Sequence, residues 1–223
     1  MKFSLQRVSA FVLPSLVFFL ASPPPSHGVL VALPSATLSA PLVDPSTIVN
    51  FGEVSISTPI QNQTIKGFTF SENIPNASTS NIGPGTTLNL SGTSLQSGAG
   101  YSPASYVLTV TMPIPVHSFG FGFAILYYVP VADAVTITVF NGLTNLGSIT
   151  YPGVPDPTPP LYIVGGFAGI GSTDYFTSAR ISFGPTAAAF AIDNLAVPEP
   201  GSLALMLLGG AVFGWRRRQT ARV

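Results

Sequence analysis

The side chains that could carry out chemistry are few in this sequence. It has no cysteine and two histidines, His27 and His117, which excludes disulfides, thiolate metal sites, cysteine nucleophiles and a zinc cluster. His27 lies in a segment that we expect to be removed, so His117 is the one imidazole left. It sits in Pro-Val-His-Ser-Phe at the entrance of a predicted strand, and Gly-Ile-Gly-Ser-Thr at 169–173 lacks the spacing of a nucleophile elbow. We therefore interpret His117 as a surface or edge residue and expect no nucleophilic catalysis.

The acidic residues leave one enzymatic alternative open. Residues 29–196 carry two basic and seven acidic side chains, a net charge of −5. Two carboxylates could together hydrolyse a glycosidic bond, but no spacing favours a pair, and Asp133, Asp156 and Asp174 fall in or beside predicted loops. Clustered Lys and Arg, which nucleic-acid binding requires, are missing from this region. The sequence predicts a non-enzymatic protein without a nucleic-acid partner, and a hydrolase is the alternative.

Tyrosine rings are the candidate ligand-binding groups. An exposed aromatic ring with polar neighbours can pack against a sugar, and the sequence holds seven tyrosines. Tyr101 lies in a predicted glycine-rich loop, and Tyr151 directly precedes the proline-rich segment 152–160. We predict that these two side chains are the ligand-binding residues if the protein binds a glycan.

The elements that must position these residues are strands. Glycine and proline supply 22 residues each, and no stretch between 29 and 196 keeps a 3.6-residue apolar period. Short runs alternate with period 2 instead, as half-buried strands do. Phe119, Phe121 and Phe123 alternate with small residues, so this aromatic row must face inward. Nine or ten such runs predict an antiparallel, two-sheet, jelly-roll-like β-sandwich. The expected strands are 47–56, 65–71, 86–91, 105–112, 119–125, 135–139, 146–151, 161–164, 178–183 and 188–195.

Glycine and proline also predict the connections between strands. Residues 135–151 predict a hairpin whose turn begins at Asn141-Gly142. The five prolines of 152–160 predict a stiff, extended crossing between the two sheets. Four glycines within 165–171 predict turns rather than a phosphate-binding loop, because no helical pattern and no lysine follow them.

The first residues have the order of a secretory signal peptide. Two basic residues precede the apolar residues 8–21, which are too few to span a bilayer, and a Pro-rich stretch with small residues follows. We predict cleavage after Gly28, with Ala32 and Ala40 as alternatives and an uncleaved anchor as a further one. The signal peptide is then 1–28 and the β-sandwich domain 29–196.

Residues 197–223 show three features in a fixed order. Pro198, Glu199 and Pro200 form a rigid, extended motif, because each proline fixes its own φ and restricts the residue before it. The apolar segment around 203–215 predicts a short transmembrane helix, about 22 Å long for about 15 apolar residues, which crosses a hydrocarbon core of about 30 Å only marginally. A basic stop at 216–222 follows and belongs on the cytoplasmic side. Its clustered arginines are Arg216, Arg217 and Arg218.

These three features resemble the PEP-CTERM sorting signal of Gram-negative bacteria. The resemblance implies a chain that is exported and tethered transiently to the inner membrane, with its body in the periplasm. An exosortase-like enzyme would then process it at the motif, where Glu199 would be the recognised charge. The expected destination is the cell surface or the extracellular matrix, and a plain C-terminal membrane anchor is the alternative.

The body resembles the jelly-roll, carbohydrate-binding-module-like domains found ahead of such tails. Calcium is the one cofactor that this resemblance implies, since a terminal-strand Asp and an early Glu pair in calcium-bearing modules, parts that Asp193 and Glu53 would play. We expect a structural or adhesive role in an exopolysaccharide layer, with a specific carbohydrate-binding module as the alternative. The segments that carry the resemblance are 50–53, 67–70, 120–123, 166–167 and 190–195.

Overall fold

The computed structural model describes residues 28–34, 47–73, 77–81, 90, 92–97, 106–126, 129–156, 163–184 and 189–197. Within these ranges the strands pair antiparallel throughout, which confirms the predicted all-β class. The described part of the chain has no helix long and apolar enough to cross a membrane. Residues 1–27 of the expected signal peptide and the expected C-terminal helix lie outside it. The strands are β1 (Leu30–Ala32), β2 (Thr64–Ile65), β3 (Phe68–Glu72), β4 (Ala77–Asn81), β5 (Thr93–Ser97), β6 (Val107–Leu126), β7 (Val131–Asn141), β8 (Thr144–Pro155), β9 (Ile163–Phe183) and β10 (Phe190–Ala196).

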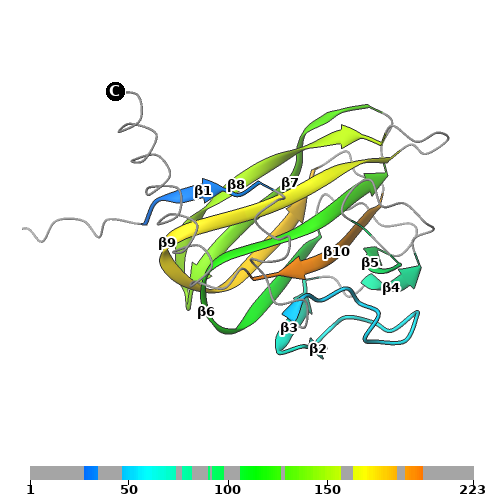
Figure 1. Ribbon diagram of the computed structural model, residues 1–223, viewed down its shortest axis with the longest axis horizontal. Coiled ribbons are helices and arrows are strands. Elements are labelled where there is room, and N and C mark those ends of the chain that lie inside the picture. The colour runs from blue at the N-terminus through cyan, green and yellow to red at the C-terminus, as the bar shows by residue number, and fades with distance from the viewer. Residues whose placement is uncertain are drawn as a thin grey trace, which may run out of the picture.

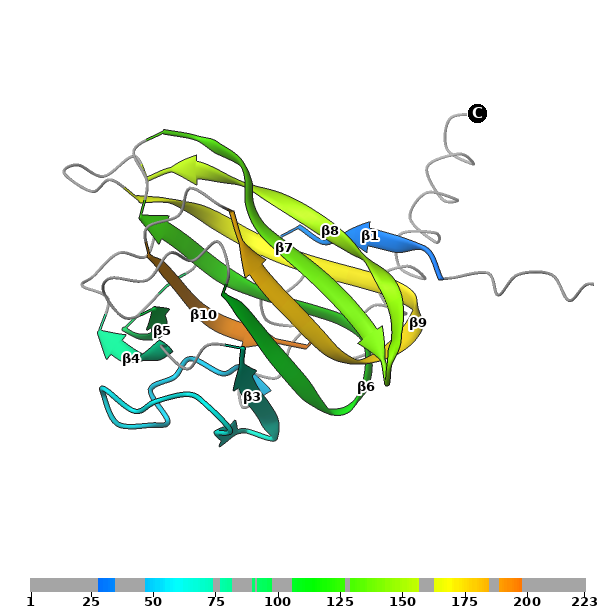
Figure 2. The ribbon, with the colours of Figure 1, turned by 180° about the vertical axis from the view of Figure 1, so that it is seen from behind.

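The strand order along the sheet is β4-β5-β10-β6-β9-β7-β8. Off this path, β1 pairs with β9, β3 pairs with β6, and β2 pairs with β3. Figure 1 and Figure 2 show β6 and β9 running side by side along the length of the molecule. These two strands therefore form the spine on which the others assemble.

Each of the two long strands bends near its middle. β6 has 20 residues and β9 has 21. Their register shifts at the bend, where Val116 pairs with Phe176, and returns to its earlier value where Ser118 pairs with Gly171. The unpaired residues form a bulge on each strand, and a bulge lets a strand pass from one sheet into another.

The bends divide the sheet into two halves. The first half-sheet contains β2, β3, β7 and most of β8, with residues 107–111 of β6 and 178–183 of β9. The second half-sheet contains β1, β4, β5 and β10, with residues 118–126 of β6 and 163–172 of β9.

One apolar core joins the two half-sheets. Phe119, Phe121 and Phe123 are fully buried in it, which confirms the predicted inward aromatic row. Phe183 of the first half-sheet stacks on Phe190 of the second, with ring centroids 4.1 Å apart. The packing of two half-sheets over a shared core is the predicted β-sandwich.

The prediction was wrong where it split the long strands. Segments 105–112 and 119–125 belong to one strand, and so do 161–164 and 178–183, as far as these ranges are described. Proline at the β6 bend and glycine before the β9 bend suggested breaks, but the backbone stays extended through the bulges. The glycines of 165–171 lie within β9 and do not form turns.

Other local predictions had mixed outcomes. The hairpin is confirmed, since β7 and β8 pair up to Asn141 and Thr144 and Gly142 takes φ +58° in the turn. Residues 47–56 are not a strand; Val49 makes a single bridge to Leu195. The proline-rich segment begins inside β8, and residues 157–160 lie outside the described ranges. The predicted strand 86–91 lies mostly outside them, and β1, β4 and β5 were not predicted.

Candidate functional site

Several predicted site residues lie outside the described part of the chain. They are the sorting motif, the basic stop and one of the two tyrosines: Pro198, Glu199, Pro200, Arg216, Arg217, Arg218 and Tyr101.

Tyr151 lies in the core and is not an exposed platform. Its side chain is 7% exposed, and its hydroxyl donates a hydrogen bond to the Gly169 carbonyl across the sandwich. The alternation of β8 places Tyr151 on the same inward face as Ile149 and Gly153. The prediction of Tyr151 as a ligand-binding residue is therefore wrong, because the ring is used in packing.

Two buried tyrosines should make the stability fall at high pH. Burial raises the pKa of Tyr151 and of Tyr106 well above the ordinary value of 10.0, and the nearby Glu72 carboxylate raises that of Tyr106 further. The unfolded chain therefore loses these two protons at a lower pH than the folded protein does. The free energy of unfolding should stay constant at pH values below the pKa that tyrosine has in the unfolded chain. Above that pKa it should fall by about 1.4 kcal/mol per pH unit for each tyrosine.

Urea unfolding of the protein between pH 9 and pH 11.5 measures this slope. Tyr106→Phe and Tyr151→Phe should each remove one tyrosine's share of it. Tyr175→Phe is the matched control, because Tyr175 is 52% exposed. A slope that persists in the double variant Tyr106→Phe/Tyr151→Phe would show that other groups cause the alkaline loss.

The two predicted calcium ligands already have protein partners. The Glu53 carboxylate pairs with Lys66 Nζ at 2.7 Å. Asp193 is fully buried in β10, and its Oδ1 accepts the Asn194 amide at 2.7 Å. Within the described residues no group of three or more His, Asp or Glu side chains could hold a metal ion. The donor set does not favour calcium, whose binding stays a prediction for metal analysis of the purified protein.

The outward surface of the first half-sheet carries a continuous array of hydroxyl groups, which we name the hydroxyl face. Its residues alternate with fully buried ones such as Leu108, Val110 and Ile137. The members of the hydroxyl face are Thr64, Thr69, Ser71, Thr109, Thr111, Thr136, Thr138, Phe140, Ser148, Thr150, Ser178, Arg180 and Ser182.

Strand register aligns these side chains in rows. One row crosses five strands in the order Ser71, Thr109, Arg180, Thr138, Ser148. Facing hydroxyls contact one another elsewhere on the face, since Thr136 and Thr150 oxygens lie 2.9 Å apart, and Thr64 and Thr69 oxygens 3.0 Å apart. Rows are separated by about 7 Å along a strand and neighbours by about 5 Å between strands. The face thus repeats hydrogen-bonding groups in two dimensions.

Arg180 is the charged residue of the hydroxyl face. Its guanidinium carbon lies 4.6 Å from the centroid of the Phe140 ring, in a cation–π contact that orients the group. It forms no ion pair with an acidic residue in the described part of the chain. A guanidinium held in this way can bind a carboxylate with two parallel hydrogen bonds.

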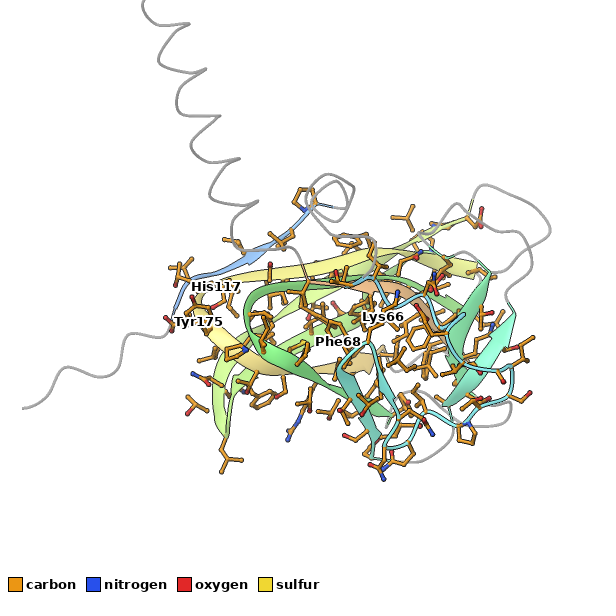
Figure 3. All side chains as sticks on the ribbon, turned by 60° about the horizontal axis from the view of Figure 1, so that its bottom comes forward. Lys66, Phe68, His117 and Tyr175 are labelled. Carbon is orange, nitrogen blue, oxygen red and sulfur yellow. The ribbon has the colours of Figure 1, made fainter. Side chains whose placement is uncertain are left out.

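An exposed aromatic ring lies at the bend of the long strands. Tyr175 packs on His117 with ring centroids 3.8 Å apart, and His117 Nδ1 lies 3.0 Å from the Ser172 carbonyl. Figure 3 shows the two rings together beside β1, away from Lys66 and Phe68. His117 is half-buried at the bend of β6, while Tyr175 is the exposed tyrosine among those described.

The sequence held a partial signal for this surface. Thr109, Thr111, Thr136 and Thr138 alternate with apolar residues and so had to face outward. Their assembly with Arg180 depends on which strands are neighbours, and this information lies in the topology.

Comparison with protein families gives one match. The PEP-CTERM protein-sorting motif matches residues 196–218. The chain carries a PEP-CTERM sorting signal. This confirms the resemblance in the tail, and the PEP-CTERM signal marks an exported protein with a C-terminal membrane-anchoring segment that an exosortase processes. No curated protein matches the chain.

Comparison with solved structures gives matches of low similarity. A variant of the carbohydrate-binding module CBM29-2 is 11% identical, with a TM-score of 0.36, covering 64% of this chain and 89% of its own. The enzymatically active domain of tailspike protein 4 from bacteriophage CBA120 is 16% identical, with a TM-score of 0.35, covering 66% and 21%. TmCBM61 in complex with β-1,4-galactotriose is 10% identical, with a TM-score of 0.34, covering 66% and 100%.

Proposed function

We propose that this protein is a non-enzymatic component of an extracellular polysaccharide layer, which it contacts through the hydroxyl face. The observation that carries the proposal is the PEP-CTERM signal at residues 196–218, because it directs the body to the exterior. The finer claim concerns the ligand: an extended polysaccharide that carries carboxylate groups.

The composition of the hydroxyl face supports this ligand class. Hydroxyl groups both donate and accept hydrogen bonds, so an array of them complements the hydroxyls of a sugar chain. The body as a whole is acidic, with a net charge of −5 over residues 29–196, so an anionic ligand needs a local cation there. Lys66 is paired with Glu53, which leaves Arg180 as the cation available to a ligand carboxylate.

The sorting part of the proposal predicts a strong effect of Glu199→Ala. Without the recognised charge, the protein should stay uncut in the inner-membrane fraction, whereas the wild-type protein is processed and leaves it. Immunoblots of fractionated cells measure this, and Asp133→Ala removes an acidic charge from the body as a control. Processing of Glu199→Ala at the wild-type rate would refute recognition of this residue.

The binding part predicts that Arg180→Gln weakens retention on a polyuronate by about tenfold or more, because a hydrogen bond to a charged group contributes about 1.5–3 kcal/mol. Affinity electrophoresis of the exported protein in polygalacturonate measures the change, and a neutral glucan is the reference polymer. Arg180→Lys keeps the charge but loses the planar fork, so it should give an intermediate value. Unchanged retention of Arg180→Gln would exclude the hydroxyl face as the site that binds the anionic polymer.

One observation favours a carbohydrate-binding module as the second candidate. The exposed Tyr175 ring, supported by His117, could pack against a single sugar ring. A glycan array distinguishes the two candidates. Tight binding to one sugar class that is lost in Tyr175→Ala would favour the module, and weak binding to many polyuronates would favour the matrix role.

A further inference from the structure

The strand β1 is built into the edge of the second half-sheet. Its residues pair with β9 in register, from Leu30 with Ser172 to Ala32 with Ile170, and the Leu33 amide donates to the Gly169 carbonyl at 2.6 Å. Gly171 makes room for this strand, since a Cβ there would lie 3.1 Å from Val31 Cγ2 and 3.2 Å from Leu33 Cδ2. β9 therefore has a site shaped for β1.

The two residues before β1 are bound by the bulge of β9. The Gly28 amide donates to Asp174 Oδ2 at 2.8 Å, and the Val29 amide donates to Thr173 Oγ1 at 3.0 Å. The Thr173 amide in turn donates to the Val29 carbonyl at 3.2 Å. Ser172 to Tyr175 are among the residues that β6 leaves unpaired at the bend. The bulge thus turns a carboxylate and a hydroxyl toward the start of the strand.

Gly28 fits this site only because it lacks a side chain. A Cβ on Gly28 would lie 2.7 Å from Asp174 Cγ, Asp174 Oδ2 and Thr173 Oγ1. The carboxylate of Asp174 is therefore in close contact with the backbone at the predicted cleavage position.

We infer that removal of the signal peptide after Gly28 creates an α-ammonium group on Val29 that binds Asp174. Water hydrolyses the Gly28–Val29 peptide bond. The water oxygen joins the Gly28 carbonyl carbon, and both water hydrogens end on the Val29 nitrogen. Gly28 then ends in a carboxylate, and Val29 begins with an ammonium group. One N–H of the ammonium keeps the bond to Thr173 Oγ1. The departure of Gly28 vacates the space beside Asp174 Oδ2, which another N–H then reaches.

The alternative cleavage positions do not preserve this arrangement. Cleavage after Ala32 or Ala40 removes β1 and leaves an unpaired edge on β9, which natural sheets avoid. Cleavage after Gly28 keeps β1 whole and replaces a neutral amide donor with a charged one, which makes the stronger hydrogen bond to a carboxylate. The first strand would thus be fixed in place by the processing step itself. The inference depends on export and not on the ligand of the hydroxyl face.

Two measurements on the full chain, expressed in a Gram-negative host, test it. Mass spectrometry of the exported protein should find Val29 as the first residue. Asp174→Asn should shift the unfolding equilibrium of the exported protein about fivefold to thirtyfold toward the unfolded state, because it removes an ion pair and a charged hydrogen bond. In unprocessed protein held in the cytoplasm the shift should be smaller, since the donor to the Asp174 carboxylate among the described residues is then the neutral Gly28 amide. Asp133→Asn serves as the matched control in both forms.

An exported chain that begins at residue 33 or 41 would overturn the inference and leave the proposed function intact. An equal effect of Asp174→Asn in processed and unprocessed protein would overturn the ammonium contact. A chain that stays in the cytoplasm with its first residues attached would overturn both this inference and the proposed function.

Discussion

Gly165→Ala should lower the free energy of unfolding by about 3–5 kcal/mol, which is at the upper end for a single methyl group. Gly165 lies in β9 opposite Ala124 of β6. A Cβ at this position would lie 2.2 Å from the Phe123 carbonyl oxygen and 2.8 Å from the Ala124 Cα. Both are backbone atoms of the central strand, so they cannot move aside as a flexible side chain would. The two strands would have to separate where they form the spine.

Urea unfolding monitored by circular dichroism measures this loss. Gly52→Ala is the matched control, because Gly52 is exposed and its added methyl group would meet only the Asn50 side chain, at 3.3 Å. The control should change the free energy of unfolding by less than about 0.5 kcal/mol. If Gly165→Ala changed the free energy of unfolding as little as Gly52→Ala, the inferred close approach of β6 and β9 at this point would be refuted.

Phe121→Ala should cost about 3–5 kcal/mol, because it removes a large apolar side chain from the core and leaves a cavity. Phe121 is fully buried, and its ring lies in a row with Phe119, at a centroid distance of 5.7 Å. A domain of this kind is stable by only about 5–15 kcal/mol, so the variant should be close to unfolding at 37 °C.

Thermal unfolding of Phe121→Ala and of Leu143→Ala compares the core with the surface. Leu143 lies at the tip of the β7–β8 hairpin and is fully exposed, so its truncation should leave the midpoint nearly unchanged. Similar midpoints for both variants would show that the aromatic row does not form the core.

The parts of the fold that the sequence predicted are those with strong local alternation. The Phe119 to Phe123 row and the β7–β8 hairpin depend on neighbouring residues, and both were predicted correctly. β4 and β5 were missed because Ala-Ser-Thr-Ser-Asn and Thr-Ser-Leu-Gln-Ser have the polar composition of loops. They become strands because each has a partner to pair with, and β10 extends the sheet beyond them.

The candidate site was harder to predict than the fold. Tyr151 was chosen for its proline neighbours, but the alternation of β8 buries it. Arg180 is one of the two basic residues in the body, yet nothing local in the sequence shows that Thr109 and Thr138 flank it on either side. Long-range pairing creates the hydroxyl face, and a single sequence does not reveal that pairing.

The position of β10 has a mechanical consequence. The matched sorting segment begins at Ala196, the last residue of this strand, and β10 is held on one side by β5 and on the other by β6. While the tail is fixed in a bilayer, any pull on the body enters the sheet through a strand with a neighbour on each flank. Several backbone hydrogen bonds on both sides of the strand would then share the load. An edge strand, by contrast, can be pulled away one hydrogen bond at a time. A cargo attached in this manner can resist shear at the cell envelope until it is released.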